Sequence, residues 1–316
     1  MATIEAAGLT RRFGELVAVD NLDLAVDREV FGLLGPNGSG KTTTVLMLTT
    51  LLRPTSGTAS VSGRDVVREA ARVRERISYV PQDMAVDIKL SGRENVSFFA
   101  ALYGGAGRDR IDEVLGIMDL AERADDLAGT YSGGMRRRLE LAPALVHEPE
   151  VLFLDEPTLG LDVAGRQAIW AHIAELRRRG MTVFVTTHYM DEADHACDRV
   201  GVIAKGRLVA ADAPAVLRRR LGGARISLRV DLPATPVTVE GARLVRREGD
   251  RLIYYAEDAA ETVPALLAAF AVEKVRVRGL EGAAPTLDDV FLALAGRQDE
   301  GGSFDYRRFR NLMRRR

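Results

Sequence analysis

Residues 35–43 read Gly35-Pro36-Asn37-Gly38-Ser39-Gly40-Lys41-Thr42-Thr43 and directly follow the apolar run Val30-Phe31-Gly32-Leu33-Leu34. The segment fits the pattern G-x-x-x-x-G-K followed by Ser or Thr, which is typical of a phosphate-binding loop between a strand and a helix. Glycines let successive backbone N–H groups turn inward around phosphate oxygens, and the helix expected from Lys41 to about Leu52 adds the positive end of its dipole. The sequence therefore predicts a nucleoside triphosphate site, with all nine residues of 35–43 close to the nucleotide.

Two side chains of this loop have specific expected roles. Lys41 is expected to reach the β- and γ-phosphates. Thr42 places a hydroxyl where Mg²⁺ needs an oxygen ligand, since Mg²⁺ prefers a few protein oxygens supplemented by water and phosphate. We therefore expect ATP and Mg²⁺ as the ligands, with Lys41 as a catalytic residue and Thr42 as a metal ligand.

An acidic pair supplies the expected second half of the site. The stretch Val151-Leu152-Phe153-Leu154 predicts a strand buried on both faces of a parallel sheet, and it ends in Asp155-Glu156. Carboxylates at the carboxyl end of such a strand face the ligand crevice. Asp155 is then suited to hold Mg²⁺ through water, and Glu156 to polarise the attacking water. Alone, the pair is equally compatible with a simple helix start, but the phosphate loop favours the catalytic interpretation.

The segment Tyr131-Ser132-Gly133-Gly134-Met135 resembles the signature of ATP-binding cassette (ABC) ATPases, which is usually Leu-Ser-Gly-Gly-Gln. Ser132 supplies a hydroxyl, Gly133 and Gly134 expose N–H groups, and the helix that begins there offers a second anion site. Tyr131 and Met135 depart from the family pattern. An ordinary helix N-cap is the alternative interpretation. Pro143, inside the same expected helix, is predicted to kink it.

Four further positions resemble family residues, in the family's order: Phe13, Gln82, Asp162 and His188. The resemblance implies that adenine stacks on Phe13 and that Gln82, between a strand and a helical subdomain, serves both Mg²⁺ and catalysis. It also implies that Asp162 belongs to the loop after the magnesium strand and that His188 senses the γ-phosphate. Taken singly, each has another interpretation: a core aromatic, a surface amide, an N-cap and a hydrogen-bonded histidine at a strand end.

Three segments are similar to the ATP-binding subunits of exporters of the daunorubicin/doxorubicin type: residues 90–96, 131–142 and 285–294. This resemblance implies an ATPase that powers a separate membrane permease and exports drugs or other hydrophobic compounds. It also implies that two copies of the chain sandwich two ATP molecules, with Ser132 and Gly134 of one copy capping the nucleotide of the other.

The expected fold class is α/β: an ABC-type P-loop ATPase core with a parallel sheet, a β-rich subdomain and an inserted helical subdomain, plus a small C-terminal α+β domain. The expected domains are residues 1–220, with the helical subdomain at about 84–147, then 224–295, then a basic tail at 296–316. In the second domain we expect strands at 226–230, 251–256 and 272–277 and helices at 261–270 and 286–294.

Composition agrees with this interpretation. Hydrophobic residues make up 47% of the 316 residues and charged residues 28%, and the formal net charge of −1 gives no reason to expect nucleic-acid binding. The single cysteine, Cys197, excludes an internal disulfide and is expected to be an inert core residue. With no apolar stretch near the roughly 18 residues of a membrane span and no signal peptide, the chain is expected to be cytoplasmic, peripheral on the inner face of the cell membrane.

Several surface features remain open at this stage. We expect the permease to contact Gln82 and residues 83–90, with Phe98, Phe99 and Tyr103 either lining that contact or lying in the core. The arginines at 136–138 and 177–179 are interpreted as solvated helix faces. The tail is interpreted as disordered, with contact to anionic lipid or RNA as the alternative. A soluble ABC ATPase that acts on DNA or ribosomes is the alternative function; a P-loop kinase or GTPase is disfavoured by Ser132-Gly133-Gly134 and the acidic pair.

Overall fold

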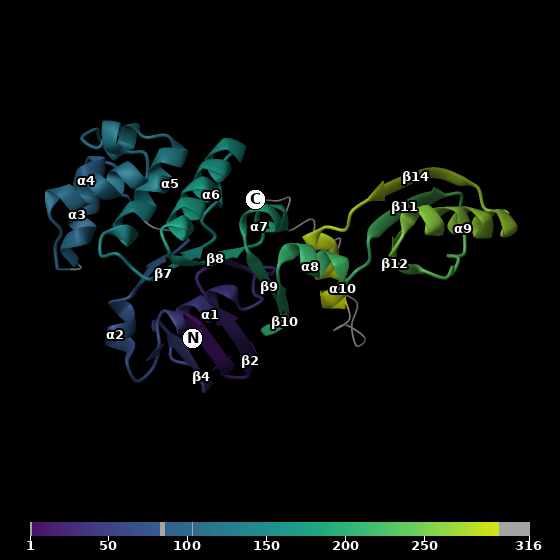
Figure 1. The fold of residues 1–316 in the computed structure, drawn as a ribbon, viewed down its shortest axis with the longest axis horizontal. Coiled ribbons are helices and arrows are strands. Elements are labelled where there is room, and N and C mark those ends of the chain that lie inside the picture. Colours follow the sequence, from purple (N-terminus) through teal and green to yellow (C-terminus); the bar gives the residue numbers. More distant parts are fainter. Residues whose placement is uncertain (1, 83–85, 103, 297–316) are drawn as a thin grey trace. The chain divides into compact units, whose positions relative to one another are not determined.

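The structure is a computed structural model that describes residues 2–82, 86–102 and 104–296. The chain divides into two compact units between Ala211 and Asp212 (Figure 1). Helix α8 (Pro214–Arg219) packs against α10 (Leu287–Gly296) and so belongs to the second unit. The division therefore falls earlier than the domain end expected at residue 220. Tyr103, Asp83 and the basic tail from residue 297 onward lie outside the described residues.

A six-stranded sheet carries the first unit, in the order β10-β9-β3-β8-β7-β6. Its strands are β10 (Arg207–Asp212), β9 (Arg199–Ala204), β3 (Val30–Leu34), β8 (Thr182–Thr187), β7 (Val151–Asp155) and β6 (Ile77–Val80). Neighbouring strands from β6 to β9 pair in parallel. Strands β3, β7 and β8 are buried at every residue, as expected for apolar runs covered on both faces.

The register of this sheet brings four strand ends to one edge. Leu34 of β3 lies opposite Thr187 of β8. Asp155 of β7 lies opposite Thr186, and Val80 of β6 lies opposite Leu154. Because parallel strands end on the same side, the segments that follow β3, β6, β7 and β8 all leave the sheet at this carboxyl edge.

A second, antiparallel sheet has the order β2-β1-β4-β5. Its strands are β1 (Ile4–Phe13), β2 (Leu16–Val26), β4 (Ser56–Val61) and β5 (Arg64–Asp65), and a short helix α2 (Ala70–Arg74) follows. Helix α1 (Lys41–Leu48) packs between the two sheets, since Met47 and Leu48 share one hydrophobic core with Leu22 of β2 and Phe153 and Phe184 of the parallel strands. This packing fixes the helix that begins at the phosphate loop.

The expected helical subdomain lies between β6 and β7. It contains α3 (Gly92–Leu102), α4 (Arg108–Ile117) and α5 (Gly133–Leu141) and the 3-10 turns η1 (Ala121–Arg123), η2 (Ala128–Thr130) and η3 (Ala142–Leu145). Figure 1 shows α3, α4 and α5 grouped together, apart from α1. The α-helix of the signature segment ends at Leu141 and is followed by η3, with Pro143 near its start. The missing N–H of the proline accounts for the end of the α-helical hydrogen-bond pattern, where the sequence predicted a kink.

Two helices complete the first unit after β7: α6 (Val163–Arg178) and α7 (Met190–Ala196). The α6 bounds match the helix that alternating strands and helices after Val151 lead us to expect at residues 163–178. Cys197, which follows α7, is buried, and burial raises the pKa of its thiol well above the ordinary value, so that it is the inert core residue expected. None of the described helices is long and apolar enough to cross a lipid bilayer.

The second unit is an antiparallel sheet in the order β12-β13-β11-β14, with one long helix. Its elements are β11 (Ala224–Val230), β12 (Ala242–Glu248), β13 (Arg251–Ala256), α9 (Ala259–Val272) and β14 (Val277–Ala283), besides α8 and α10. Tyr254, Leu266 and Phe270 form its core between sheet and helix. The strand expected at 272–277 is wrong: α9 runs through Val272, Lys274 adopts a φ of 55°, and β14 begins only at Val277.

Candidate nucleotide site

The backbone of residues 35–40 forms a turn that only glycine can adopt at key positions. Gly38 and Gly40 have φ angles of 80° and 107°, in the left-handed region. A Cβ on Gly35 would lie 2.4 Å from the carbonyl oxygen of Ile203, and one on Gly40 would lie 2.5 Å from that of Ala18. The loop is therefore packed closely against β9 and β2. It leads directly into α1, whose N-terminus faces the loop.

Lys41 lies at the centre of the loop and is only 5% exposed. Its Nζ donates to the carbonyl oxygens of Gly35 at 2.9 Å and Pro36 at 3.3 Å, and lies 3.5 Å from Oε1 of Glu156. Burial lowers the pKa of Lys41, although the negative charge of Glu156 opposes this shift. The ammonium is thus held in place by the loop and by the acidic residue after β7.

Asp155, at the end of β7, is 3% exposed and binds two threonines. Thr42 Oγ1 donates to its Oδ2 at 2.9 Å, and Thr186 Oγ1 of β8 donates to its Oδ1. A carboxylate and a hydroxyl therefore stand side by side at the start of α1. These are hard oxygen ligands of the kind that Mg²⁺ prefers, so this donor set fits the ion.

Glu156 has a left-handed backbone, with a φ of 49°, which is uncommon for a residue with a long side chain. Its N–H donates to both the carbonyl oxygen and the Oγ1 of Thr186, each at 3.1 Å. Its Oε2 lies 2.9 Å from Nδ1 of His188, as a close contact rather than an aligned hydrogen bond. Burial acts to raise the pKa of Glu156, but His188 and Lys41 together outweigh it and the pKa is lowered.

The structure thus brings together five of the residues that the sequence singled out: Lys41, Thr42, Asp155, Glu156 and His188. They come from β3–α1, β7 and β8, whose ends share the carboxyl edge. Two further loop residues, Ser39 and Gly40, are also buried there, and Ser39 Oγ has no hydrogen-bond partner among the described residues.

The signature residues stand elsewhere in the first unit, at the start of α5. Ser132 caps this helix, with its Oγ accepting from the N–H of Met135 at 3.2 Å, and Ser132 and Gly133 are exposed. Tyr131, which replaces the usual leucine, is 3% exposed, and its hydroxyl donates to the carbonyl oxygen of Arg123. The substituted tyrosine therefore anchors the signature inside the helical subdomain.

The remaining expected residues make other contacts. Phe13 is 45% exposed at the end of β1, so it is not a core residue, and the guanidinium of Arg11 lies 4.6 Å from its ring centroid. Asp162 caps α6, with Oδ1 accepting from the N–H of Gly165 at 2.8 Å. Gln82 is exposed, and its carbonyl oxygen accepts from Arg137 at 3.3 Å.

Sequence reasoning misassigned Arg137. It was grouped with solvated arginines, but it is 7% exposed. Arg136 and the arginines at 177–179 are exposed, as expected. The missed signal is the spacing: Arg137 lies four residues before Leu141, so the two share the buried face of α5. Thr186, which binds both Asp155 and the backbone of Glu156, was also missed.

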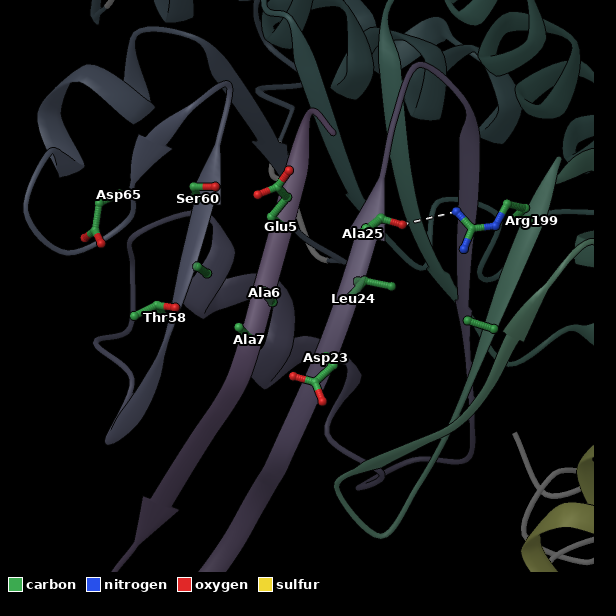
Figure 2. A pocket seen from close by; sticks show the side chains of 12 residues that line it. Glu5, Ala6, Ala7, Asp23, Leu24, Ala25, Thr58, Ser60, Asp65 and Arg199 are labelled. Carbon is green, nitrogen blue, oxygen red and sulfur yellow. Dashed lines mark hydrogen bonds between the residues drawn. The ribbon is translucent and has the colours of Figure 1, made fainter. Parts of the chain in front are cut away.

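A hollow of about 670 Å³ lies on the β-rich part of the first unit, away from these residues (Figure 2). Glu5 of β1 and Asp23 of β2 line it. Both carboxylates are engaged by nearby backbone, since Asp23 accepts from Gly8 N at 2.7 Å and Glu5 from Ala2 N at 3.2 Å. The hollow contains none of the phosphate-loop residues.

Comparisons with known proteins agree with this geometry. Residues 19–159 match the ABC transporter family model, and residues 214–295 match the C-terminal domain of DrrA1-3-like ATP-binding proteins. The daunorubicin resistance ATP-binding protein DrrA3 of Streptomyces coeruleorubidus is 43% identical over 308 residues, covering 93% of this chain and 96% of that protein. The daunorubicin/doxorubicin resistance ATP-binding protein DrrA of Streptomyces peucetius is 41% identical, covering 93% and 92%.

A solved structure supports the fold of the first unit. It is the dimeric post-hydrolysis state of an ATP-binding cassette bound to ADP and phosphate, with 26% identity, a TM-score of 0.58, and coverage of 66% of this chain and 98% of that one. The expected α/β core with its β-rich and helical subdomains is confirmed, and ATP hydrolysis is the activity characteristic of such cassettes. Together with identity above 40% along more than nine-tenths of the sequence, this shows that the chain belongs to the ATP-binding proteins of the ABC transporter family.

Proposed function

We propose that this chain is the ATP-hydrolysing subunit of an ABC exporter and powers a separate membrane permease. The observation that carries the proposal is the meeting of Lys41, Thr42, Asp155, Glu156 and His188 at the carboxyl edge of the parallel sheet. A cation, two oxygen ligands, an ionised carboxylate and a histidine are the groups that phosphoryl transfer to water requires.

The phosphate loop binds the triphosphate of ATP. Its inward backbone N–H groups, the N-terminus of α1 and the Lys41 ammonium all favour negative charge at this place. Ser39 Oγ, which is buried and has no hydrogen-bond partner in the described part of the chain, is a further polar group in the loop. We assign adenine to the exposed ring of Phe13, whose one face is covered by Arg11. The other ring face is then the stacking surface.

Thr42 and Asp155 would hold Mg²⁺, and Gln82 is the further residue that family resemblance assigns to the metal. When bound, the ion neutralises part of the charge on the β- and γ-phosphates. Thr186 fixes the Asp155 carboxylate through its hydroxyl. This second contact keeps the carboxylate oriented toward Thr42 at the start of α1.

Glu156 accepts a hydrogen bond, and then the proton, from the water that attacks the γ-phosphorus as the bond from that phosphorus to the bridging oxygen of ADP breaks, so that inorganic phosphate and ADP are the products. The lowered pKa of Glu156 means that burial does not protonate it at neutral pH, and the ionised carboxylate is the form that can take a proton from water. His188, 2.9 Å from Oε2, orients the carboxylate and in the closed state contacts the γ-phosphate.

Two copies of the chain complete the sites. We assign Ser132, Gly133 and Gly134 to the nucleotide held by the second copy. We assign Asp162, in the loop that precedes α6, to the region between the two copies. The exposure of Ser132 and Gly133 supports this assignment, because a helix N-terminus that faces solvent remains available to an anion from another molecule. ATP favours the closed pair through γ-phosphate contacts that ADP lacks, and hydrolysis releases them.

The permease docks on the helical subdomain in this proposal. Phe98 and Leu102 of α3 are 61% and 71% exposed, and Phe99 is half-buried beside Phe98. Exposed neighbouring apolar side chains on one helix favour a partner surface over a core position. Phe98→Asp is expected to weaken co-purification with the permease while leaving ATP binding intact; Leu51→Asp, at another exposed apolar residue, serves as the matched control.

The transported compound is proposed to be a drug or another hydrophobic molecule, because relatives at more than 40% identity are named for daunorubicin and doxorubicin resistance. Cells that produce the chain with its permease should show reduced accumulation of daunorubicin. Equal accumulation in the presence of an active ATPase would direct the search to other hydrophobic compounds.

The test of the hydrolytic function is Glu156→Gln. We expect the variant to bind ATP, to accumulate as a nucleotide-bound dimer and to lose turnover, because the amide cannot take the role of the ionised carboxylate. Glu175→Gln, at a half-buried glutamate of α6 whose carboxylate pairs with Arg178 and Arg179, is the control and should hydrolyse ATP at the normal rate. Undiminished hydrolysis by Glu156→Gln contradicts the proposal.

A further inference from the structure

A buried arginine links the signature helix to the hydrolytic residue. Arg137 of α5 lies five residues after Ser132, and its guanidinium donates to three backbone carbonyl oxygens outside its own helix. Nε donates to Pro157 O at 2.7 Å, Nη1 to Gln82 O at 3.3 Å, and Nη2 to Glu156 O at 3.5 Å. One side chain therefore joins α5, the segment after β6 and the segment after β7.

The chemistry of this contact requires arginine. Burying a cation is unfavourable unless it is paired, and Glu140, one turn along α5, supplies the pairing charge at 2.6 Å from Nη1. Because that ion pair lies within one helix, the remaining donors are free to reach the other segments. A lysine ammonium keeps the positive charge but lacks the planar guanidinium group, whose N–H donors reach several acceptors at fixed angles.

Glu156 is held from both sides of its backbone. Its N–H donates to Thr186 of β8, and its carbonyl oxygen accepts from Arg137 at 3.5 Å and from the N–H of Leu159 at 3.2 Å. This double restraint acts on a residue in the left-handed region, where a non-glycine backbone is costly and persists only if its surroundings fix it. The direction of the Glu156 carboxylate toward Lys41 and His188 consequently depends on the position of α5.

We propose that Arg137 is a positioning residue that couples the signature helix to Glu156 in the same chain. This inference rests on the proposed function. The start of α5 carries Ser132, which meets the nucleotide of the second copy, whereas Glu156 acts on the nucleotide of its own copy. When the two copies close on ATP, the movement of α5 is transmitted by the Arg137 guanidinium to the peptide between Glu156 and Pro157. The Glu156 carboxylate is therefore aligned for water activation only when the nucleotide site that Ser132 contacts is filled.

The decisive variants are Arg137→Lys and Glu140→Gln, with Arg136→Gln at the exposed neighbour as the control. The full chain is used with its permease, and kcat for ATP hydrolysis, the ATP dissociation constant and the melting temperature are measured. We expect Arg137→Lys to lower kcat by about 10-fold or more, as loss of one or two charge-assisted hydrogen bonds at a positioned group predicts, with ATP affinity changed by less than about 2-fold. Glu140→Gln, which keeps the fork, should have a smaller effect on kcat.

The cooperativity of hydrolysis with ATP concentration gives a second measurement. In the wild type, the rate of ATP hydrolysis should rise cooperatively with ATP concentration, because the two nucleotide sites act together. In Arg137→Lys, the rate should rise without cooperativity. A kcat equal to that of the wild type overturns the inference. So does a parallel loss of kcat, ATP affinity and melting temperature, which indicates a purely structural role. An inactive wild type would instead contradict the proposed function, so the two failures are distinguishable.

Discussion

The phosphate loop and the signature segment both lie at the start of a helix, and both are proposed to bind phosphate, but their side chains differ in burial and contacts. Around the loop, Lys41, Asp155 and Glu156 are 5%, 3% and 8% exposed; Lys41 pairs with Glu156, and Asp155 binds the hydroxyls of Thr42 and Thr186. At the signature, Ser132 is exposed and its hydroxyl serves only its own helix cap. One site is formed inside the chain, whereas the other is presented on its surface. This contrast is what we expect if each chain supplies half of two shared nucleotide sites.

The largest effect is expected for Lys41→Met. Removing the buried ammonium takes away a charge-assisted contact to phosphate, and we expect ATP affinity of the isolated chain to fall by about 100-fold, equivalent to about 3 kcal/mol. Titration with a fluorescent ATP analogue measures the effect. Lys89→Met, at an exposed lysine, should bind normally. If Lys41→Met binds ATP as tightly as the wild type, the loop is not the phosphate site.

The signature side is tested by Ser132→Arg. Ser132 is exposed, and its hydroxyl binds the start of α5 rather than the phosphate loop. The ATP affinity of the isolated chain should therefore change by less than about 2-fold. A bulky cation at the interface should block ATP-dependent dimerisation and lower kcat by at least about 10-fold. Gel filtration with and without ATP measures the dimer. Loss of binding by the monomer would place Ser132 in its own nucleotide pocket.

The buried charges around Glu156 predict a pH dependence of stability. Its folded pKa lies below the ordinary 4.5, so its ionised form stabilises the folded state. This contribution is fully present above pH 4.5 and is lost as the pH falls through the folded pKa. The difference in unfolding free energy between wild type and Glu156→Gln should therefore be largest near neutral pH and shrink at lower pH. Urea unfolding between pH 3 and 7 measures it; a difference that grows on acidification is incompatible with the lowered pKa.

The smallest effect is expected at Asp162. Its carboxylate caps α6, so Asp162→Ala should lower stability by about 1 kcal/mol, with ATP affinity of the monomer changed by less than about 2-fold. Asp258→Ala removes the equivalent cap of α9 in the second unit and is the matched control. A larger loss of monomer affinity in Asp162→Ala would show that this carboxylate belongs to the phosphate site of its own chain.

Much of the first unit could be predicted because its signals are local. Asp155 and His188 could be singled out because each comes at the end of an apolar strand. The glycines at 38 and 40 indicate positive φ angles, which other residues rarely adopt. The helix at 163–178 followed from the alternation of strands and helices after Val151, and the structure shows that Asp162, assigned to the nucleotide by resemblance, caps it. In these places one stretch of chain contains all the information that its conformation requires.

Predictions failed where a residue's partners lie far along the chain. The apolar residues near Val275 suggested a strand, but Val275 packs against the second-unit core beyond the end of α9. Arg137 was assigned to the surface because a charged side chain has no visible partner in sequence, although its acceptors are 55, 19 and 20 residues away. The type of a side chain does not show which backbone carbonyl oxygens the fold will bring within reach as hydrogen-bond acceptors.

The kind of chemistry can be predicted from residue order alone: a glycine loop with Lys41 and Thr42, an acidic pair after an apolar strand, and a histidine after another. These depend on residue types and short-range backbone geometry, which a linear pattern records. Only the tertiary structure decided that β3, β7 and β8 end in register, that Thr186 fixes Asp155 and that Arg137 holds the Glu156 peptide. Strand order and buried hydrogen bonds arise from packing between distant segments, and that packing is not recorded in any single stretch of sequence.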